Sequence, residues 1–178
     1  MQQRMIQRSP LFLLLFAAFL ALSAAAPVAA ADRDTSDAGL QAVFPGYEVA
    51  RRALADDSLD GVAPAALELQ EALESLRTNF SAQRAGVPEE KADEVAALLP
   101  EAATAAGQLA AAKDLDAARD ALYALTKPLV RWRQAAGEGP AVAYCSMEKR
   151  SWLQRPGEAI GNPYSGHQML TCGEIVSQ

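Results

Sequence analysis

The residues of this sequence that are best suited to hold a soft metal ion lie together near its C-terminus. After a leader at the N-terminus, every cysteine, methionine and histidine falls between positions 145 and 172. They are Cys145, Met147, His167, Met169 and Cys172. Thiolate and thioether groups select soft ions such as Cu(I), and imidazole also binds copper and zinc. Packing of helices would scatter methionines along the chain, so their confinement to one segment indicates a shared role.

The combination of ligands favours Cu(I) or Ag(I) over harder cations. If the chain is extended after Tyr144, Cys145 and Met147 point to the same side. If the two ends of the segment pair, Met169 and Cys172 approach them. Such a set disfavours Mg²⁺ and Ca²⁺, and Zn²⁺ is less suited because the usual paired-cysteine motifs are missing. We therefore predict a metal site made by these four residues, with the histidine beside them.

Structural explanations for the same residues stay open. In an oxidising compartment paired cysteines tend to form disulfides, and a Cys145–Cys172 bond would stabilise the segment by about 3 kcal/mol in the chain-entropy model. The cysteines can also be plain buried thiols. Met147 and Met169 can be core residues, because methionine fills irregular gaps, and His167 can be an exposed turn residue. Disulfide formation and metal binding can also alternate with redox state.

The sequence gives little support for an enzyme. His167 is the only histidine, so it is the only available imidazole base. No spacing of serine, histidine and aspartate suggests a nucleophilic triad. A phosphate-binding glycine loop is missing, and so is the CxxC of a thioredoxin-like site. We expect a protein without catalytic residues.

The first 31 residues have the layout of a secretory signal peptide. Arg4 and Arg8 precede an apolar run from Leu11 to Leu22, and small residues at 28–31 fit a cleavage site. Together with the small residues that follow it, the apolar stretch is about long enough for an uncleaved membrane anchor, but a proline and an alanine-rich end favour cleavage. We therefore predict a periplasmic or secreted mature chain with no stable membrane insertion.

The charge of the mature chain limits its partners. Cleavage after residue 31 removes two of the 16 Lys and Arg residues and none of the 22 acids, which leaves a net charge of −8. An acidic chain is a poor ligand for nucleic acid and is repelled by anionic membranes. The composition, 51% hydrophobic and 21% charged, is enough to bury a core. The length of 178 residues suits one domain.

The elements that must position the Cys/Met segment are amphipathic helices. Apolar residues recur with the helical period from Leu40 onward, and proline and glycine divide the run into four parts. The predicted helices cover about 45–57, 64–86, 88–112 and 114–137. Because proline removes a helical hydrogen bond and clashes with the preceding turn, Pro100 should kink or split the third helix, and Pro128 should bend the fourth. Asp114 is the expected N-cap of the fourth.

These helices predict a mainly α fold, an up-and-down four-helix bundle. We expect a flexible N-terminus over 32–39 and a single domain over 40–178. After Pro140 the character changes, and 141–145 resembles a short strand followed by turn-forming residues. A second strand is expected from 169–172 and 174–176. Residues 140–178 thus predict a small, turn-rich cap with a β-hairpin.

The C-terminal segment resembles a known family, catalogued as domain of unknown function 3347. The motifs that carry the resemblance are Tyr144-Cys145-Ser146-Met147, Ser151-Trp152-Leu153-Gln154, Ile160-Gly161-Asn162-Pro163-Tyr164-Ser165-Gly166 and Met169-Leu170-Thr171-Cys172-Gly173-Glu174-Ile175. The family has Cys-Pro-Met where this chain has Cys-Ser-Met, which keeps both sulfur groups. The resemblance extends over most of the mature chain. Members of the family are exported helical domains, which occur alone or at the C-terminus of periplasmic adaptor proteins of copper and silver efflux pumps.

The resemblance implies an exported binding domain for copper or silver handling. The partner would be a metal-efflux adaptor or another periplasmic protein. Cys145, Met147, Met169 and Cys172 would carry the site, while Asn162, Pro163, Tyr164 and Gly166 would form the turn that brings its two ends together. The alternative is a protein-interaction module that holds no metal and is stapled by a disulfide between the two cysteines.

Overall fold

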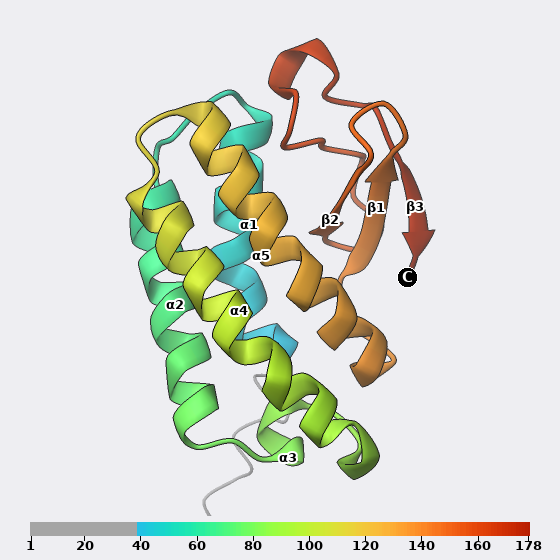
Figure 1. The fold of residues 1–178 in the computed structure, drawn as a ribbon. Coiled ribbons are helices and arrows are strands. Elements are labelled where there is room, and N and C mark those ends of the chain that lie inside the picture. Colours follow the sequence, from blue (N-terminus) through green and yellow to red (C-terminus); the bar gives the residue numbers. More distant parts are fainter. Residues whose placement is uncertain (1–38) are drawn as a thin grey trace, which may run out of the picture. The chain divides into compact units, whose positions relative to one another are not determined.

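The computed structural model describes residues 39–178, in which long helices precede a small C-terminal sheet (Figure 1). The predicted mainly α class with a C-terminal β part is therefore confirmed. The predicted signal peptide and all but the last residue of the predicted flexible N-terminus lie outside the described residues. The elements are α1 (Leu40–Ala55), α2 (Val62–Thr78), α3 (Ala82–Ala85), a 3-10 turn η2 (Glu89–Lys91), α4 (Ala92–Ala111), α5 (Leu115–Ala136), β1 (Ala141–Cys145), β2 (Arg150–Gln154), a 3-10 turn η3 (Gly166–Gln168) and β3 (Glu174–Ser177).

The fifth helix, α5, begins and ends at the residues that its sequence predicts. The Asp114 carboxylate accepts a hydrogen bond from the Ala117 N–H at 2.8 Å, so the predicted N-cap is confirmed. Gly137 follows the helix in the left-handed conformation, with φ of 80°. The apolar stripe between these caps is buried along its length, including Leu122, Leu129 and Trp132.

Prolines interrupt the helices less than we expected. The first helix begins at Leu40 rather than near 45, and Pro45 lies inside it. Pro100 lies inside a continuous α4, so the predicted split does not occur. Leu98, Leu99 and Ala102 are buried on either side of Pro100. Tertiary packing of these neighbours therefore outweighs the hydrogen bond that each proline removes.

The second predicted helix is too long, because the chain leaves the helical path at 79–81. The second helix ends at Thr78, so Phe80, which falls within the predicted range 64–86, lies outside it. Ser81 then caps the separate helix α3 by accepting a hydrogen bond from the Arg84 N–H at 3.1 Å. Gly86 ends that short helix with φ of 64°. A second N-cap inside the apolar run is the local cause of the break.

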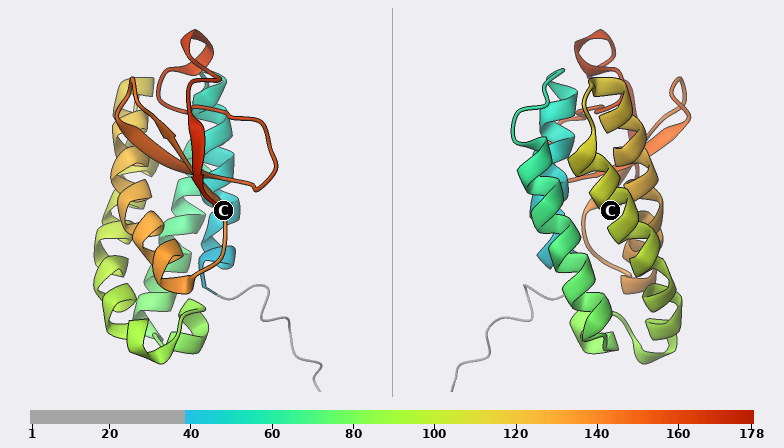
Figure 2. Two further views of the ribbon diagram at one scale, coloured as in Figure 1. Left: turned by 90° about the vertical axis from the view of Figure 1, so that its right-hand side faces the viewer. Right: turned by 60° about the vertical axis from the view of Figure 1, so that its left-hand side comes forward.

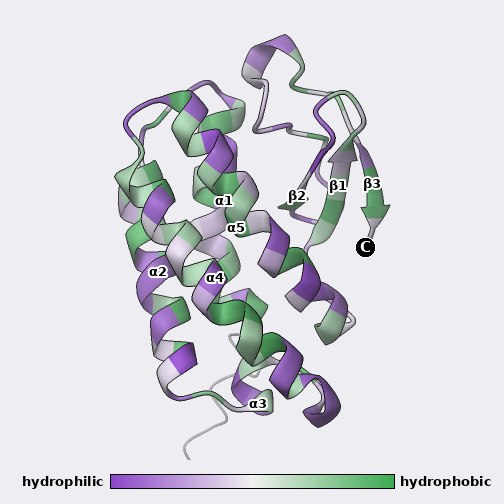
Figure 3. Ribbon diagram, in the orientation of Figure 1, coloured by the Kyte–Doolittle hydropathy of each residue, from purple (hydrophilic) through white to green (hydrophobic). Residues whose placement is uncertain are grey.

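The helices pack through a core of leucine and alanine. The second helix lies against α4, α4 against α5, and α1 against both α2 and α5. Hydrophobic and hydrophilic bands alternate along each of these helices (Figure 3). Ala66, Ala102 and Ala106 are buried between the longer side chains, and their small size allows neighbouring helices to approach closely. No helix in residues 39–178 has the length and apolar character needed to span a bilayer.

The C-terminal sheet has three antiparallel strands in the order β2-β1-β3, beside α5 and α1 (Figure 2). The predicted first strand is confirmed. The predicted pairing between the two ends of the segment is also confirmed, because Ala143 lies opposite Ile175 and Tyr144 opposite Glu174. Residues 169–172 are a turn rather than the strand we expected. The second strand was not predicted, because three consecutive buried residues, Trp152 to Gln154, give no alternating pattern.

Candidate functional site

The two cysteines form a disulfide. Cys145 ends β1 and is fully buried, and Cys172 lies two residues before β3. Their Cα atoms are 5.7 Å apart and the residues are 27 positions apart in sequence. Of the explanations that the sequence left open, the structure therefore has the disulfide rather than plain buried thiols. The bond ties the central strand of the sheet to the loop that leads into the edge strand.

The other three sulfur and imidazole candidates lie on two separate turns. Met147 is in the turn between β1 and β2 and is 73% exposed, so the idea that it fills the core is wrong. Met169 directly follows η3 and is partly buried. His167 lies within η3, with 67% of its side chain exposed. Within residues 39–178, no three His, Cys, Asp or Glu side chains are grouped as ligands of one ion.

The His167 side chain is bound to a carboxylate at the end of α1. Asp57 Oδ2 accepts hydrogen bonds from the His167 backbone N–H at 2.9 Å and lies 2.8 Å from its ring Nδ1. Arg119 on α5 donates to the other carboxylate oxygen at 2.5 Å. The backbone bond from His167, and then the Arg119 contact, hold the pKa of Asp57 well below its usual range. Gly166 lies so close to this carboxylate that a Cβ atom there would overlap it.

The turn around Asn162 is held by hydrogen bonds to later residues of the loop between β2 and β3. The buried Asn162 side chain accepts a hydrogen bond from the Tyr164 N–H at 2.8 Å and donates to the Cys172 carbonyl at 3.3 Å. Its own N–H donates to the Leu170 carbonyl at 2.8 Å. The Pro163 carbonyl accepts from Arg119 at 3.0 Å. These bonds place the turn against α5 and beside the disulfide.

A buried network of hydroxyl groups, which the sequence did not indicate, joins the sheet to α1 and α5. The Tyr47 hydroxyl lies 2.7 Å from Thr126 Oγ1 and accepts a hydrogen bond from the Leu153 N–H at 3.2 Å. Tyr164 donates to the Ser151 carbonyl at 2.6 Å. Burial raises the pKa of Tyr47 to about 12 and that of Tyr164 well above its usual value. Both phenols are therefore neutral near pH 7 and serve as hydrogen-bonding groups.

A second polar cluster on α1 holds the loop that follows β2. Glu48 is buried, and its carboxylate accepts hydrogen bonds from Arg51 at 2.8 and 2.9 Å and from Arg52 at 2.6 Å. Burial opposes the charge of Glu48, but the two guanidinium groups prevail and lower its pKa. Arg51 also donates to the Gly161 carbonyl at 2.6 Å, and Arg52 pairs with Glu158 at 2.5 Å. A charged pair on the first helix thus reaches residues 110 and 106 positions further along the chain.

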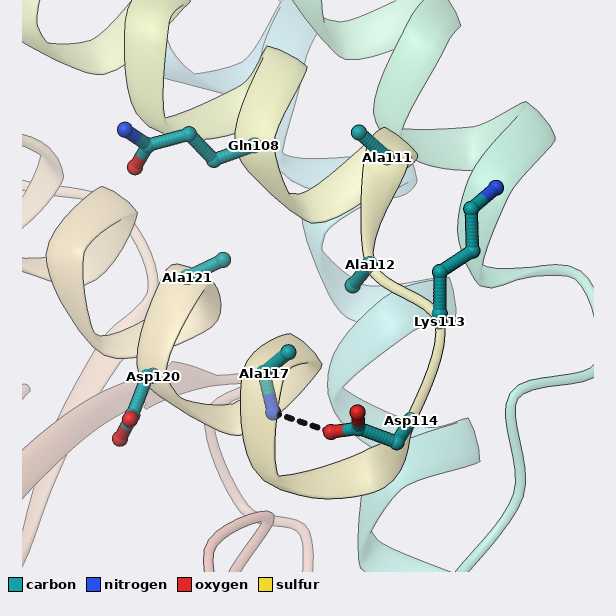
Figure 4. A pocket seen from close by; sticks show the side chains of 8 residues that line it. All are labelled: Gln108, Ala111, Ala112, Lys113, Asp114, Ala117, Asp120 and Ala121. Atoms are coloured by element: carbon teal, nitrogen blue, oxygen red, sulfur yellow. Dashed lines mark hydrogen bonds between the residues drawn. The ribbon is translucent and has the colours of Figure 1, made fainter.

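Where α4 turns into α5, the surface has an open depression of about 550 Å³ (Figure 4). It is lined by Gln108, Ala111, Ala112, Lys113, Asp114, Ala117, Asp120 and Ala121. Four of these eight residues are alanines, and the Asp114 carboxylate is already used by the α5 cap. It contains none of the candidate sulfur or imidazole residues.

Comparisons with known proteins do not place this chain in a family. No family model matches it, and neither a curated protein nor a solved structure does. The resemblance to domain of unknown function 3347 therefore stays a prediction.

Proposed function

We propose that this protein is an exported, non-enzymatic interaction module, in which the Cys145–Cys172 disulfide fastens the C-terminal segment. Its helices are best interpreted as an up-and-down four-helix bundle, since α1, α2, α4 and α5 alternate in direction in Figures 1 and 2. The predicted periplasmic or secreted location favours this proposal, because disulfides persist in oxidising compartments.

The disulfide is the observation that carries this proposal. A cysteine binds a soft metal as its thiolate, and the oxidised pair has no thiolate to offer. Cys145 is also fully buried, whereas Met147 is 73% exposed. In the oxidised chain, the four predicted ligands are therefore reduced to two methionines on separate turns.

The polar anchors support the same proposal. Tyr47 and Arg51 on α1, and Arg119 on α5, each bond to main-chain groups of the C-terminal segment. A network of buried side-chain bonds whose members are satisfied holds a structure in one arrangement. A C-terminal segment held in one arrangement suits a docking surface for a protein partner. It suits a metal site less well, because the segment would have to rearrange to surround an ion.

A second candidate applies to the reduced chain, and the same two cysteines favour it. Reduction would release two thiols held close together, with Met147 two residues after one and Met169 three residues before the other. Such a set, with His167 nearby in sequence, would suit Cu(I) or Ag(I). The protein would then pass the ion to a metal-efflux adaptor or another periplasmic protein, as the family resemblance implies.

An anaerobic Cu(I) titration against a chromophoric chelator separates the two candidates. We would titrate the oxidised protein, the reduced protein, and a Met147→Leu/Met169→Leu variant in both its oxidised and its reduced form. Leucine conserves the volume of methionine closely, so a purely structural role survives the change. If the protein is an interaction module, the oxidised protein should take no Cu(I) from the chelator. Saturable binding by the oxidised protein that is lost in the double variant would overturn it in favour of metal handling.

The number of free thiols shows whether the oxidised or the reduced titration describes the protein as it occurs. Protein taken directly from the periplasm or medium, denatured without reductant, should show no free thiol. Two free thiols per chain would mean that the protein works in its reduced form, and the Cu(I) candidate would replace the interaction module.

A further inference from the structure

The charges of the described residues are unevenly distributed over the helices. Together α2 and α4 carry six acidic residues and one basic residue. Residues 121–137, which make up most of α5, carry three basic residues and no acid. A chain whose predicted mature charge is −8 therefore keeps a positive region on one helix.

Three side chains of this region lie along one side of α5. Tyr123, Lys127 and Arg131 are spaced four residues apart, which places them one above another on a helix. Lys127 and Arg131 are exposed and Tyr123 is half-buried. The Lys127 ammonium group lies 5.3 Å from the centre of the Tyr123 ring. Within residues 39–178, neither Lys127 nor Arg131 forms an ion pair.

The sheet adds a fourth side chain to this surface. The Arg150 guanidinium of β2 lies 5.0 Å from the centre of the Tyr123 ring and 5.3 Å from that of Tyr164. It also donates to Asp120 at 2.9 Å, and 28% of its side chain is exposed. Contacts with two aromatic rings and a carboxylate hold this guanidinium in place before any partner arrives. Tyrosine and arginine are among the residue types that often dominate the binding energy of protein interfaces.

We infer that the α5 basic surface, formed by Tyr123, Lys127, Arg131 and Arg150, docks an acidic polypeptide segment of a partner protein. This inference rests on the proposed function and specifies its partner. The eight residue steps from Tyr123 to Arg131 span about 12 Å along the helix, which matches about four residues of an extended segment. Carboxylates of such a segment would face Lys127 and Arg131, which have no carboxylate partner among the described residues.

The distribution of charge favours a short segment over a large polyanion. Exposed charges act over about 8 Å at physiological ionic strength, so a short segment lying on α5 interacts mainly with this surface. A nucleic acid or an anionic membrane is larger than this surface and also reaches the acidic residues of the neighbouring helix α4, where it is repelled. The basic surface is thus selective for the size of its ligand as well as for its charge.

The test uses the oxidised mature protein and a short, fluorescein-labelled, glutamate-rich peptide, with binding followed by fluorescence anisotropy. We expect saturable binding that weakens with salt, and a Lys127→Glu/Arg131→Glu variant that binds at least about tenfold more weakly, because like charges would then face each other. The matched control is Lys113→Glu/Arg77→Glu, which changes the same residue types and the same net charge at exposed positions outside α5. It should stay within about twofold of the unchanged protein. Circular dichroism establishes that both variants are folded.

Three results would overturn the inference: no peptide binding by the unchanged protein, equal weakening in both variants, or tighter binding of a DNA duplex or of phosphatidylglycerol vesicles than of the peptide. The same preparation is carried through the Cu(I) titration and the thiol count. If those two measurements favour the interaction module and the peptide fails to bind, only the α5 surface is wrong. If the oxidised protein takes up Cu(I), the proposed function itself fails.

Discussion

Two regions of this molecule are held together by different physical means. The packing of α2 against α4 depends on leucine and alanine, with buried residues such as Leu73, Leu99 and Ala106. The C-terminal segment relies on directed contacts: a disulfide, two tyrosine hydroxyls, and arginines from α1 and α5 that reach main-chain carbonyls. Apolar burial has no direction, so it tolerates small shifts. Hydrogen bonds are directional, so they determine where the C-terminal segment lies on the helices and how it is oriented.

The largest effect should follow from replacing Trp132, a core residue of α5 that contacts α3. Trp132 is 1% exposed, and its indole donates to the Ala85 carbonyl at 2.9 Å. Replacing it with alanine removes the burial and leaves a cavity, which should lower the free energy of unfolding by about 3–5 kcal/mol. Urea unfolding followed by far-ultraviolet circular dichroism measures this. A loss below about 1 kcal/mol would mean that the helices do not depend on this contact.

Removal of the disulfide should come next in size and should affect mainly the other region. The Cys145→Ser/Cys172→Ser variant loses the constraint on the unfolded chain and should be less stable by about 3–4 kcal/mol. Hydrogen exchange should rise most in residues 160–178, while the helices keep their protection. Equal acceleration over α2 and α4 would show that the two regions unfold as one unit and are not held independently.

A smaller effect is expected from the hydroxyl network. Tyr47→Phe keeps the ring but leaves the buried Leu153 N–H without this acceptor and removes the hydrogen bond to Thr126. The free energy of unfolding should fall by about 1–3 kcal/mol. Phe44→Tyr, which adds a hydroxyl to a buried ring one turn away, controls for the aromatic packing of α1. It should not alter hydrogen exchange in β2, whereas Tyr47→Phe should accelerate it.

The same tyrosine should make stability depend on alkaline pH. Its pKa is raised from about 10 in the unfolded chain to about 12 in the folded protein. The unfolded chain therefore loses this proton first, and the contribution of Tyr47 is complete below about pH 10 and lost as the pH rises to about 12. Unfolding measured over this range should show the unchanged protein approaching the Tyr47→Phe variant in stability. A constant difference between them would contradict the assignment.

The smallest and most local effect should come from Asp57→Asn. The change weakens the bonds to His167 and Arg119 at the surface, so we expect faster hydrogen exchange at 166–168 with little change in global unfolding. Because the pKa of Asp57 is lowered, its contribution is present above the usual carboxylate pKa and is lost as the pH falls through the lowered value. Mild acid should therefore leave η3 protected in the unchanged protein. Exchange at 166–168 that already rises in mild acid would show that the pKa of Asp57 is not lowered.

Local signals in the sequence determined where several elements begin and end. A side-chain cap at Asp114 and a glycine at 137 set the limits of α5, and an apolar stretch after Pro140 set the first strand. The pattern of two cysteines, in a chain that we predict to be exported, limited the chemistry of the C-terminal segment to a disulfide, a metal site or plain thiols. Each of these depends on neighbours within a few positions, or on residue type alone.

Only the tertiary structure decided how the C-terminal segment is held. Tyr47 meets Thr126 across 79 positions, and Arg51 meets Gly161 across 110. The two cysteines bond because β1 and β3 pair and bring them together. Helices continue through Pro45 and Pro100 because distant side chains bury their neighbours. Contacts of this kind depend on how the whole chain packs, and a local pattern of residues does not encode them.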